Sequence, residues 1–109
     1  MPTFIVTGSY TSQGMKGMLE HPTDREAETR KLIEALGGKI VCYYLTTGDT
    51  DFMMVVKAKI STDIVPGAIV AGASGRVTGL KTVRAYSSAE FLEMQKRAAE
   101  VVKSFRPAG

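Results

Sequence analysis

The feature that most constrains this chain is an unbroken run of five apolar residues, residues 52–56, which follows the segment TTGDTD and precedes Lys57. A strand with one face in solvent alternates apolar and polar residues, because successive side chains point to opposite faces of the sheet. This run does not alternate. We therefore predict a strand whose two faces are both covered, and what covers the second face bears directly on function.

The order of the elements around this strand predicts the fold. Strands are expected where β-branched and aromatic residues gather, at residues 3–10, 39–47, 52–59 and 76–87. Helices are expected at residues 12–21, 24–36, 61–73 and 88–105. The order β-α-β-β-α-β plus a C-terminal helix predicts an α+β, ferredoxin-like fold, with a four-stranded antiparallel sheet and the helices on one face. The 109 residues are expected to form a single domain, residues 1–109.

Local signals predict where the helices begin. Thr23 and Glu26 have the spacing of a capping box, as do Ser87 and Glu90, so helices are expected to start just after Thr23 and Ser87. The helix predicted over residues 12–21 is weaker, because each of its two internal glycines costs about 1 kcal/mol relative to alanine.

The C-terminal helix carries an apolar stripe. Its members recur three or four positions apart, as expected for one face of a helix: Phe91, Met94, Ala98, Val101 and Phe105. This pattern predicts that the helix buries one side against another surface.

The second face of the sheet predicts a homodimer. On the strand over residues 52–59, Met53 and Val55 point away from the side that carries Phe52, Met54 and Val56. Leaving such side chains in water forgoes about 1.5–3 kcal/mol each, and a large exposed apolar patch usually marks an interface or a ligand groove. The economical cover is the sheet of a second copy, packed face to face.

A small ligand could lie between the two sheets. We expect Val83 and Ala85 to face the helices, so that Arg84 and Tyr86 look into the intersheet space, where Arg84 would bind a carboxylate or carbonyl group. The predicted ligand-binding residues are Thr7, Ser9, Tyr43, Met53, Arg84 and Tyr86. The alternative is that Arg84 emerges at the rim of the sheet and meets solvent or Asp51.

The pattern of the chain also resembles a known family. The strand ending in Tyr10, the segments EALGGKIVCYYLTTGDTDFMMVV and VTGLKTVRAYSSAEF, and their spacing over roughly residues 3–91 are similar to the GYD-domain family. The resemblance implies small bacterial proteins with a dimeric α/β-barrel, ferredoxin-like fold, and it implies no particular chemistry. Gly48 and Asp51 would match the glycine and aspartate of the family's Gly-Tyr-Asp signature, while Thr50 stands where the tyrosine is expected.

Composition excludes several functional classes. With Cys42 as the only cysteine and His21 as the only histidine, the chain can build neither an internal disulfide nor a histidine-based metal cluster or triad. No cofactor or metal is therefore expected. The net charge of +3 comes from scattered basic residues, so no nucleic-acid partner is expected. No apolar run approaches the ~20 residues that span a membrane, and the first residues lack a basic leader, which favours the cytoplasm.

Three functional classes remain open. The first is a small-molecule-binding or accessory protein that acts as a homo-oligomer. The second is a cofactor-independent enzyme of the monooxygenase or isomerase type, with candidate groups Tyr10, Tyr43, Asp51, Arg84 and Tyr86. The third is an assembly protein whose role is oligomerisation itself. The turn motif Gly48, Asp49 and Asp51 is expected to be structural, with Gly48 in a backbone conformation that favours glycine and an aspartate bonded to turn amides.

Overall fold

The computed structural model describes residues 1–59 and 61–108, with the side chains of residues 61–63 outside that description. Eight elements follow one another along the chain: β1 (Thr3–Tyr10), α1 (Ser12–Glu20), α2 (Arg25–Ala35), β2 (Lys39–Leu45), β3 (Phe52–Lys57), α3 (Ser61–Ala73), β4 (Val77–Ala85) and α4 (Ser88–Val102). The predicted order is confirmed.

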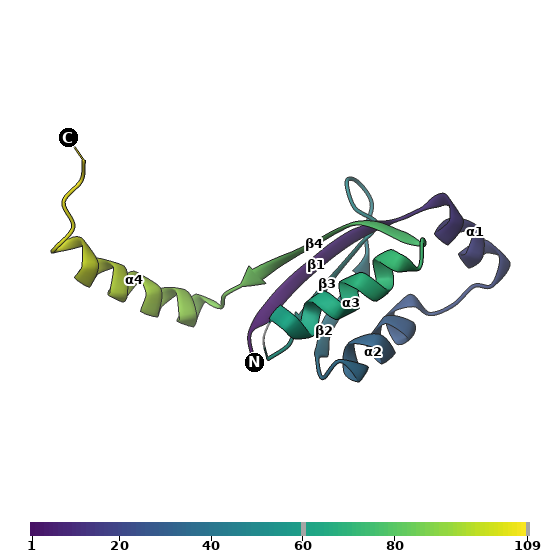
Figure 1. Cartoon of the computed structure of the whole chain (residues 1–109), viewed down its shortest axis with the longest axis horizontal. Coiled ribbons are helices and arrows are strands. Elements are labelled where there is room, and N and C mark those ends of the chain that lie inside the picture. Colours follow the sequence, from purple (N-terminus) through teal and green to yellow (C-terminus); the bar gives the residue numbers. More distant parts are fainter. Residues whose placement is uncertain (60, 109) are drawn as a thin grey trace.

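The four strands form one antiparallel sheet in the order β2-β3-β1-β4. Helices α2 and α3 lie against one face of this sheet, and α1 lies near the end of β1 (Figure 1). This is the ferredoxin-like arrangement predicted from the order of the elements. The opposite face of the sheet, which we call the open face, is covered by none of the helices in the described part of the chain.

The core lies between the sheet and the helices. Phe52, Met54 and Val56 on β3 are buried, whereas Met53 and Val55 between them are only half-buried on the open face. The buried side chains that complete this layer come from β1, β2 and α2: Phe4, Val6, Ile33, Ile40 and Tyr43. The alternation on β3 confirms the predicted orientation of that strand.

Two irregularities change which residues share a face. On β2 the pairing with β3 passes from Ile40 opposite Val56 to Cys42 opposite Val55, so Val41 is an extra residue in the strand. On β4 the pairing with β1 shifts where Gly79 adopts a φ of +62°, a conformation that suits glycine at a β-bulge. After each bulge, the side chains change faces relative to a regular strand.

Of the two capping boxes that the sequence predicts, one is present; the cap expected for α3 at Ser61, Thr62 or Asp63 lies outside the described side chains. The Ser87 hydroxyl accepts from the Glu90 N–H and the Glu90 side chain accepts from the Ser87 N–H, which is the predicted capping box. The box predicted at Thr23 is wrong, because Asp24 caps α2 instead and accepts from the Ala27 N–H at 3.0 Å.

Helix α4 leaves the body at the end of β4 (Figure 1). In the described part of the chain it packs against none of the other elements beyond a contact of its first turn with Arg84. The radius of gyration is consequently 17.9 Å, against about 13 Å for a compact domain of about 100 residues. The predicted stripe therefore stays open, with Phe91 58% and Phe105 64% exposed.

Candidate functional site

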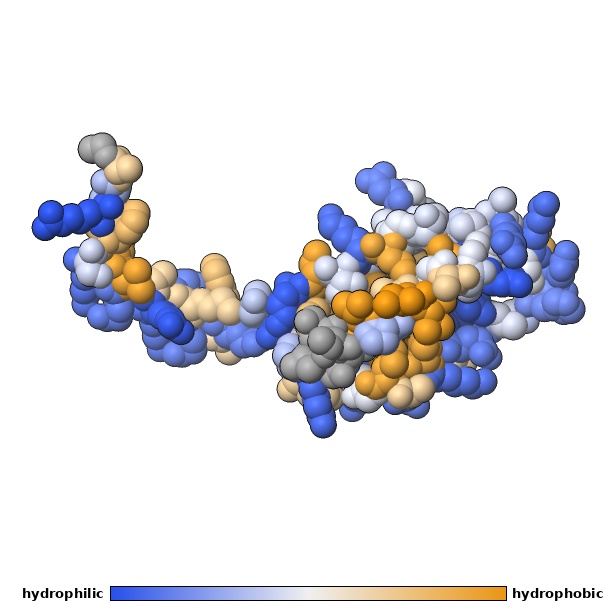
Figure 2. Space-filling view, in the orientation of Figure 1, coloured by the Kyte–Doolittle hydropathy of each residue, from blue (hydrophilic) through white to orange (hydrophobic). Residues whose placement is uncertain are grey.

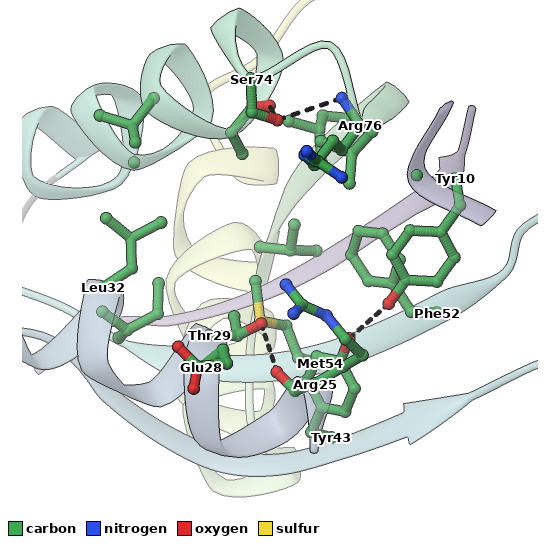
Figure 3. Close-up of a pocket in the computed structure, with 18 of the residues that line it drawn as sticks. Tyr10, Arg25, Glu28, Thr29, Leu32, Tyr43, Phe52, Met54, Ser74 and Arg76 are labelled. Atoms are coloured by element: carbon green, nitrogen blue, oxygen red, sulfur yellow. Dashed lines mark hydrogen bonds between the residues drawn. The ribbon is translucent and has the colours of Figure 1, made fainter. Parts of the chain in front are cut away.

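A cavity of about 490 Å³ lies between the sheet and helices α1, α2 and α3 (Figure 3). Its volume falls within the range of sites that hold small organic molecules. The sheet and α2 contribute part of its apolar wall: Val6, Leu32, Ile33, Phe52, Met54 and Leu80. Helices α1 and α3 contribute the rest, among them Met18, Ile64 and Ala71. This cavity lies on the helix-covered side of the sheet, whereas the sequence suggested a site on the open face.

Two tyrosines form a hydrogen-bonded pair in this cavity. The hydroxyl oxygens of Tyr10 and Tyr43 lie 3.0 Å apart, and both rings pack on Phe52, with ring centroids at 5.4 and 6.1 Å. Burial, followed by the hydrogen bond with Tyr10, raises the pKa of Tyr43 well above its ordinary value. Tyr43 therefore stays a neutral phenol at physiological pH. Because one hydroxyl donates to the other, the pair keeps a second proton that can be donated to a ligand.

The turn between β2 and β3 positions Tyr10. The Tyr10 N–H donates to Oδ2 of Asp51 at 2.8 Å, and the Asp51 N–H donates to the Gly8 carbonyl at 2.8 Å. Asp51 thus ties the end of β1 to the start of β3 rather than bonding to amides of its own turn. Gly48 in this turn has a φ of +108°, the conformation expected there for glycine. Asp49 is exposed.

Two arginines reach the same cavity from different elements. Arg25 begins α2, and Arg76 stands in the connection between α3 and β4. Figure 3 shows both side chains among the residues that line the space. Arg25 donates to the Thr23 hydroxyl at 3.0 Å. Among the side chains that the structure describes, no carboxylate oxygen lies within 4.0 Å of either guanidinium group.

Helix α1 closes one side of the cavity through its glycines. A Cβ atom at Gly14 would overlap the Arg76 carbonyl oxygen, and a Cβ atom at Gly17 would overlap the Arg76 guanidinium group. The Thr11 N–H donates to that same carbonyl oxygen at 3.0 Å. The two residues that weaken α1 by propensity therefore permit its close approach to the segment that carries Arg76.

The structure does not bring the six predicted ligand-binding residues together. Thr7 lies opposite Met53 on the open face, and Ser9 shares that side of β1. Tyr43 lies opposite the buried Met54 and lines the helix-side cavity, because the extra residue Val41 reverses the expected parity of β2.

The predicted orientation of Arg84 is wrong. Arg84 lies opposite the buried Phe4 on the helix-covered side, whereas Val83 lies opposite Ile5 on the open face. Its guanidinium group donates to the carbonyl oxygens of Thr3 and Ala85 and packs 4.4 Å from the centroid of the exposed Tyr86 ring.

The acidic partner of Arg84 is also not the predicted one. The Arg84 guanidinium lies 3.6 Å from Glu90, not beside Asp51. The Ser87 N–H and, more weakly, Arg84 lower the pKa of Glu90. These contacts give Arg84 a structural role at the start of α4.

Sequence reasoning missed Arg25, Arg76 and the cavity itself. Periodicity predicts which side of a helix faces a sheet, but not how far the helices spread apart over it. One signal was present: two glycines three positions apart in a short helix indicate close approach of another backbone.

The model of the GYD domain matches residues 4–95. The chain belongs to the GYD-domain family. The match includes every strand and helices α1–α3, and it ends within α4.

One relative and one solved structure that match this chain come from Thermus thermophilus. Its "Glutamine synthetase and cystathionine beta-lyase binding protein" is 27% identical over 77 residues, which cover 71% of this chain and 81% of that protein. The crystal structure of TTHA0845 from the same species matches with a TM-score of 0.51 at 18% identity, over 81% of this chain and 96% of that one. The second match supports the fold alone.

A second solved structure also matches this chain. The crystal structure of FFRP-DM1 gives a TM-score of 0.48 at 13% identity, over 79% of this chain and the whole of that one. Among the described residues, no helix is both long and apolar enough to cross a bilayer. The same residues contain no cluster of three or more His, Cys, Asp or Glu side chains suited to a metal ion.

Proposed function

We propose that this GYD-domain protein is a small-molecule-binding accessory protein that works as a homodimer, with one ligand site between the helices and the sheet of each protomer. The observation that carries the proposal is the cavity of about 490 Å³, which is lined by apolar side chains, a hydrogen-bonded tyrosine pair and two arginines. A largely apolar pocket with a few convergent polar groups is the usual form of a small-molecule site.

The accessory part of the proposal has a separate support. The Thermus thermophilus relative is named as a binding protein of two enzymes. By analogy, this chain would bind a partner enzyme and carry its small-molecule ligand as a signal or as cargo. The ligand site lies on the helix side, so ligand binding and protein contacts through other surfaces would not compete for the same residues.

The homodimer is proposed from the open face. Ile5, Met53 and Val55 lie there half-buried, while Val83 is 42% and Tyr44 is 62% exposed. The bulge in β4 makes this face more apolar than the sequence suggested, because it directs Val83 outward. An apolar sheet face of this extent is unfavourable in water, and a second copy offers a matching surface by two-fold symmetry.

Helix α4 also supports a second copy of the chain as the binding partner. Only Tyr86 and Ser87 separate β4 from α4, and the capping box and the Arg84–Glu90 ion pair hold the first turn of the helix. Among the described residues, the apolar stripe does not lie on its own sheet. Figure 2 shows apolar residues along α4 and over α3 that stay uncovered in one chain. We therefore assign the stripe on α4 to contacts with the second copy.

Sedimentation equilibrium tests the homodimer. The wild-type protein should be a dimer at micromolar concentration, and Met53→Lys should raise the dissociation constant at least tenfold, because it places an unpaired charge between the sheets. Phe91→Lys on the stripe should also weaken association. The matched controls are Ala27→Lys, at an exposed position of α2, and Ala99→Lys, on another side of α4. A folded wild-type monomer at these concentrations would refute the homodimer.

Native mass spectrometry of protein purified from its own cells tests the ligand site. A retained organic molecule should appear with the wild type and disappear in Ala71→Phe, because the new ring fills the cavity. Ala73→Phe is the matched control, since Ala73 is exposed two positions further along α3 and does not line the cavity. Loss of ligand from both variants, or from neither, would place the site elsewhere.

A further inference from the structure

We propose that the cavity binds a small organic carboxylate with a slender or flat apolar body, and that Arg76 and Arg25 hold its carboxylate group. This inference rests on the proposed function, because it names the class of ligand that the same cavity would take.

Arg25 and Arg76 bring positive charge to the cavity. Within the described side chains, no carboxylate oxygen lies within 4.0 Å of either guanidinium group, although both arginines line the cavity. Arg76 is exposed, and Arg25 is half-buried. A guanidinium group binds a carboxylate through two parallel hydrogen bonds, and this geometry is available only where the fork has no acidic partner of its own.

Two acidic residues, Glu20 and Glu28, also line the cavity, and both are exposed. The Glu28 carboxylate lies 3.3 Å from the Lys31 ammonium group, which offsets its charge. Glu20 ends α1 at the rim. His21 follows at the same rim and is exposed. Among the described charged groups that reach the cavity without an ion-pair partner, Glu20 at the rim is acidic and Arg25 and Arg76 are cationic, so positive charge is in excess.

The backbone of Arg76 is held in place by two hydrogen bonds. The Thr11 N–H donates to the Arg76 carbonyl oxygen, and the Arg76 N–H donates to the Ser74 hydroxyl at 3.1 Å. Its guanidinium group packs over Gly17, where no side chain intervenes. The backbone of Arg76 is therefore held in place, while its guanidinium group remains available to bind an anion.

The sheet side of the cavity is largely apolar. Phe52, Met54 and Leu80 form an apolar floor on the sheet, which favours a hydrocarbon body over a polyhydroxylated one. Tyr43 stays neutral, since burial raises its pKa, and its hydroxyl is hydrogen-bonded to that of Tyr10. A neutral hydroxyl can donate a hydrogen bond to a polar group on the body, whereas a phenolate would repel an anion.

Isothermal titration calorimetry with matched pairs of compounds tests the inference. The probes are benzoate with benzamide, 4-methylbenzoate with 4-methylbenzamide, and hexanoate with hexanamide, each pair differing in charge and hardly in size. The best carboxylate should bind at least tenfold more tightly than its amide, and its affinity should fall as salt is raised. Arg76→Met should reduce carboxylate affinity at least tenfold and leave amide affinity unchanged, and Arg25→Met should act in the same direction.

The control is Arg106→Met, which removes an exposed cation from a position beyond α4 and should change nothing. Thermal unfolding of each variant establishes that it is folded. Equal binding of amide and carboxylate, with sensitivity to Ala71→Phe, would overturn the carboxylate assignment and keep the cavity as a binding site. Absence of binding by every carboxylate, or carboxylate binding that survives Ala71→Phe, would overturn the inference, and the second result would also move the ligand site.

Discussion

The two glycines of α1 give a prediction with opposite outcomes at positions three residues apart. Alanine favours a helix over glycine by about 1 kcal/mol, so propensity alone predicts that Gly14→Ala and Gly17→Ala both stabilise the protein. The structure predicts that only one of them does. At Gly14 the new methyl group meets the backbone carbonyl of Arg76, whereas at Gly17 it meets the tip of a flexible side chain.

The magnitudes follow from what has to move. In Gly14→Ala the helix must shift away from the connection before β4, which costs about 1–3 kcal/mol of overpacking. The shift also weakens the hydrogen bond from the Thr11 N–H to the Arg76 carbonyl, worth about 1 kcal/mol. Set against the gain of about 1 kcal/mol in propensity, the net loss is about 1–3 kcal/mol. In Gly17→Ala only the Arg76 guanidinium moves, so stability should stay level or rise by up to about 1 kcal/mol.

Urea unfolding followed by circular dichroism measures both changes, with the wild type and Ser12→Ala, at an exposed position of the same helix, as references. Gly17→Ala should in addition weaken carboxylate binding, because the methyl group displaces Arg76 from its place beside the cavity. Equal stability of the two variants would refute the close approach of α1 to Arg76. A stable Gly17→Ala variant with unchanged binding would refute the role given to the Arg76 tip.

Two further predictions concern the polar groups around the tyrosine pair. Asp51→Ala should lower the free energy of unfolding by about 1–3 kcal/mol, because it leaves the Tyr10 N–H without its acceptor. Asp51→Asn keeps an oxygen acceptor and should lower it clearly less in the same urea titration. Equal losses in the two variants would contradict the role of Asp51. Tyr43 has a raised pKa when folded, so its contribution to stability is complete below its unfolded pKa of about 10 and is lost as the pH rises beyond it. Tyr43→Phe should therefore lessen the fall in unfolding free energy at alkaline pH. In a pH titration followed by absorbance at 295 nm, this variant should lack the tyrosine that ionises at the highest pH. An unchanged titration curve would show that Tyr43 is not buried.

The fold was predictable because its signals are local and repeated. Strand composition, the apolar run over residues 52–56 and the Ser87–Glu90 capping box each agree with the observed elements. The orientation of β3 also follows from alternation alone, since that strand pairs without irregularity with β1.

The site was not predictable, because bulges and helix positions depend on the whole sheet. Parity counting assumes regular strands, and one extra residue at Val41 was enough to move Tyr43 to the other face. Gly79 inside a predicted strand is a known sign of a bulge, and the pairing of β4 with β1 shifts at this glycine. The cap at Asp24 was missed because two adjacent residues, Thr23 and Asp24, both suit that position. The cavity depends on how α1, α2 and α3 spread over the sheet, which no local pattern contains.

Neighbouring methionines on opposite faces of β3 allow one measurement to test the central claim, that the ligand site lies on the helix side and the open face is buried by a second copy. Met54 and Met18 line the cavity, whereas Met53 lies on the open face. NMR spectra of protein labelled with ¹³C at the methionine methyl groups should show Met54 and Met18 shifting when a binding carboxylate such as 4-methylbenzoate is added, with Met53 unmoved. Dilution through the dimer dissociation range should shift Met53 and leave Met54 in place. A ligand that shifts Met53 and spares Met54, or a Met53 signal indifferent to dilution into the monomer, would contradict the account.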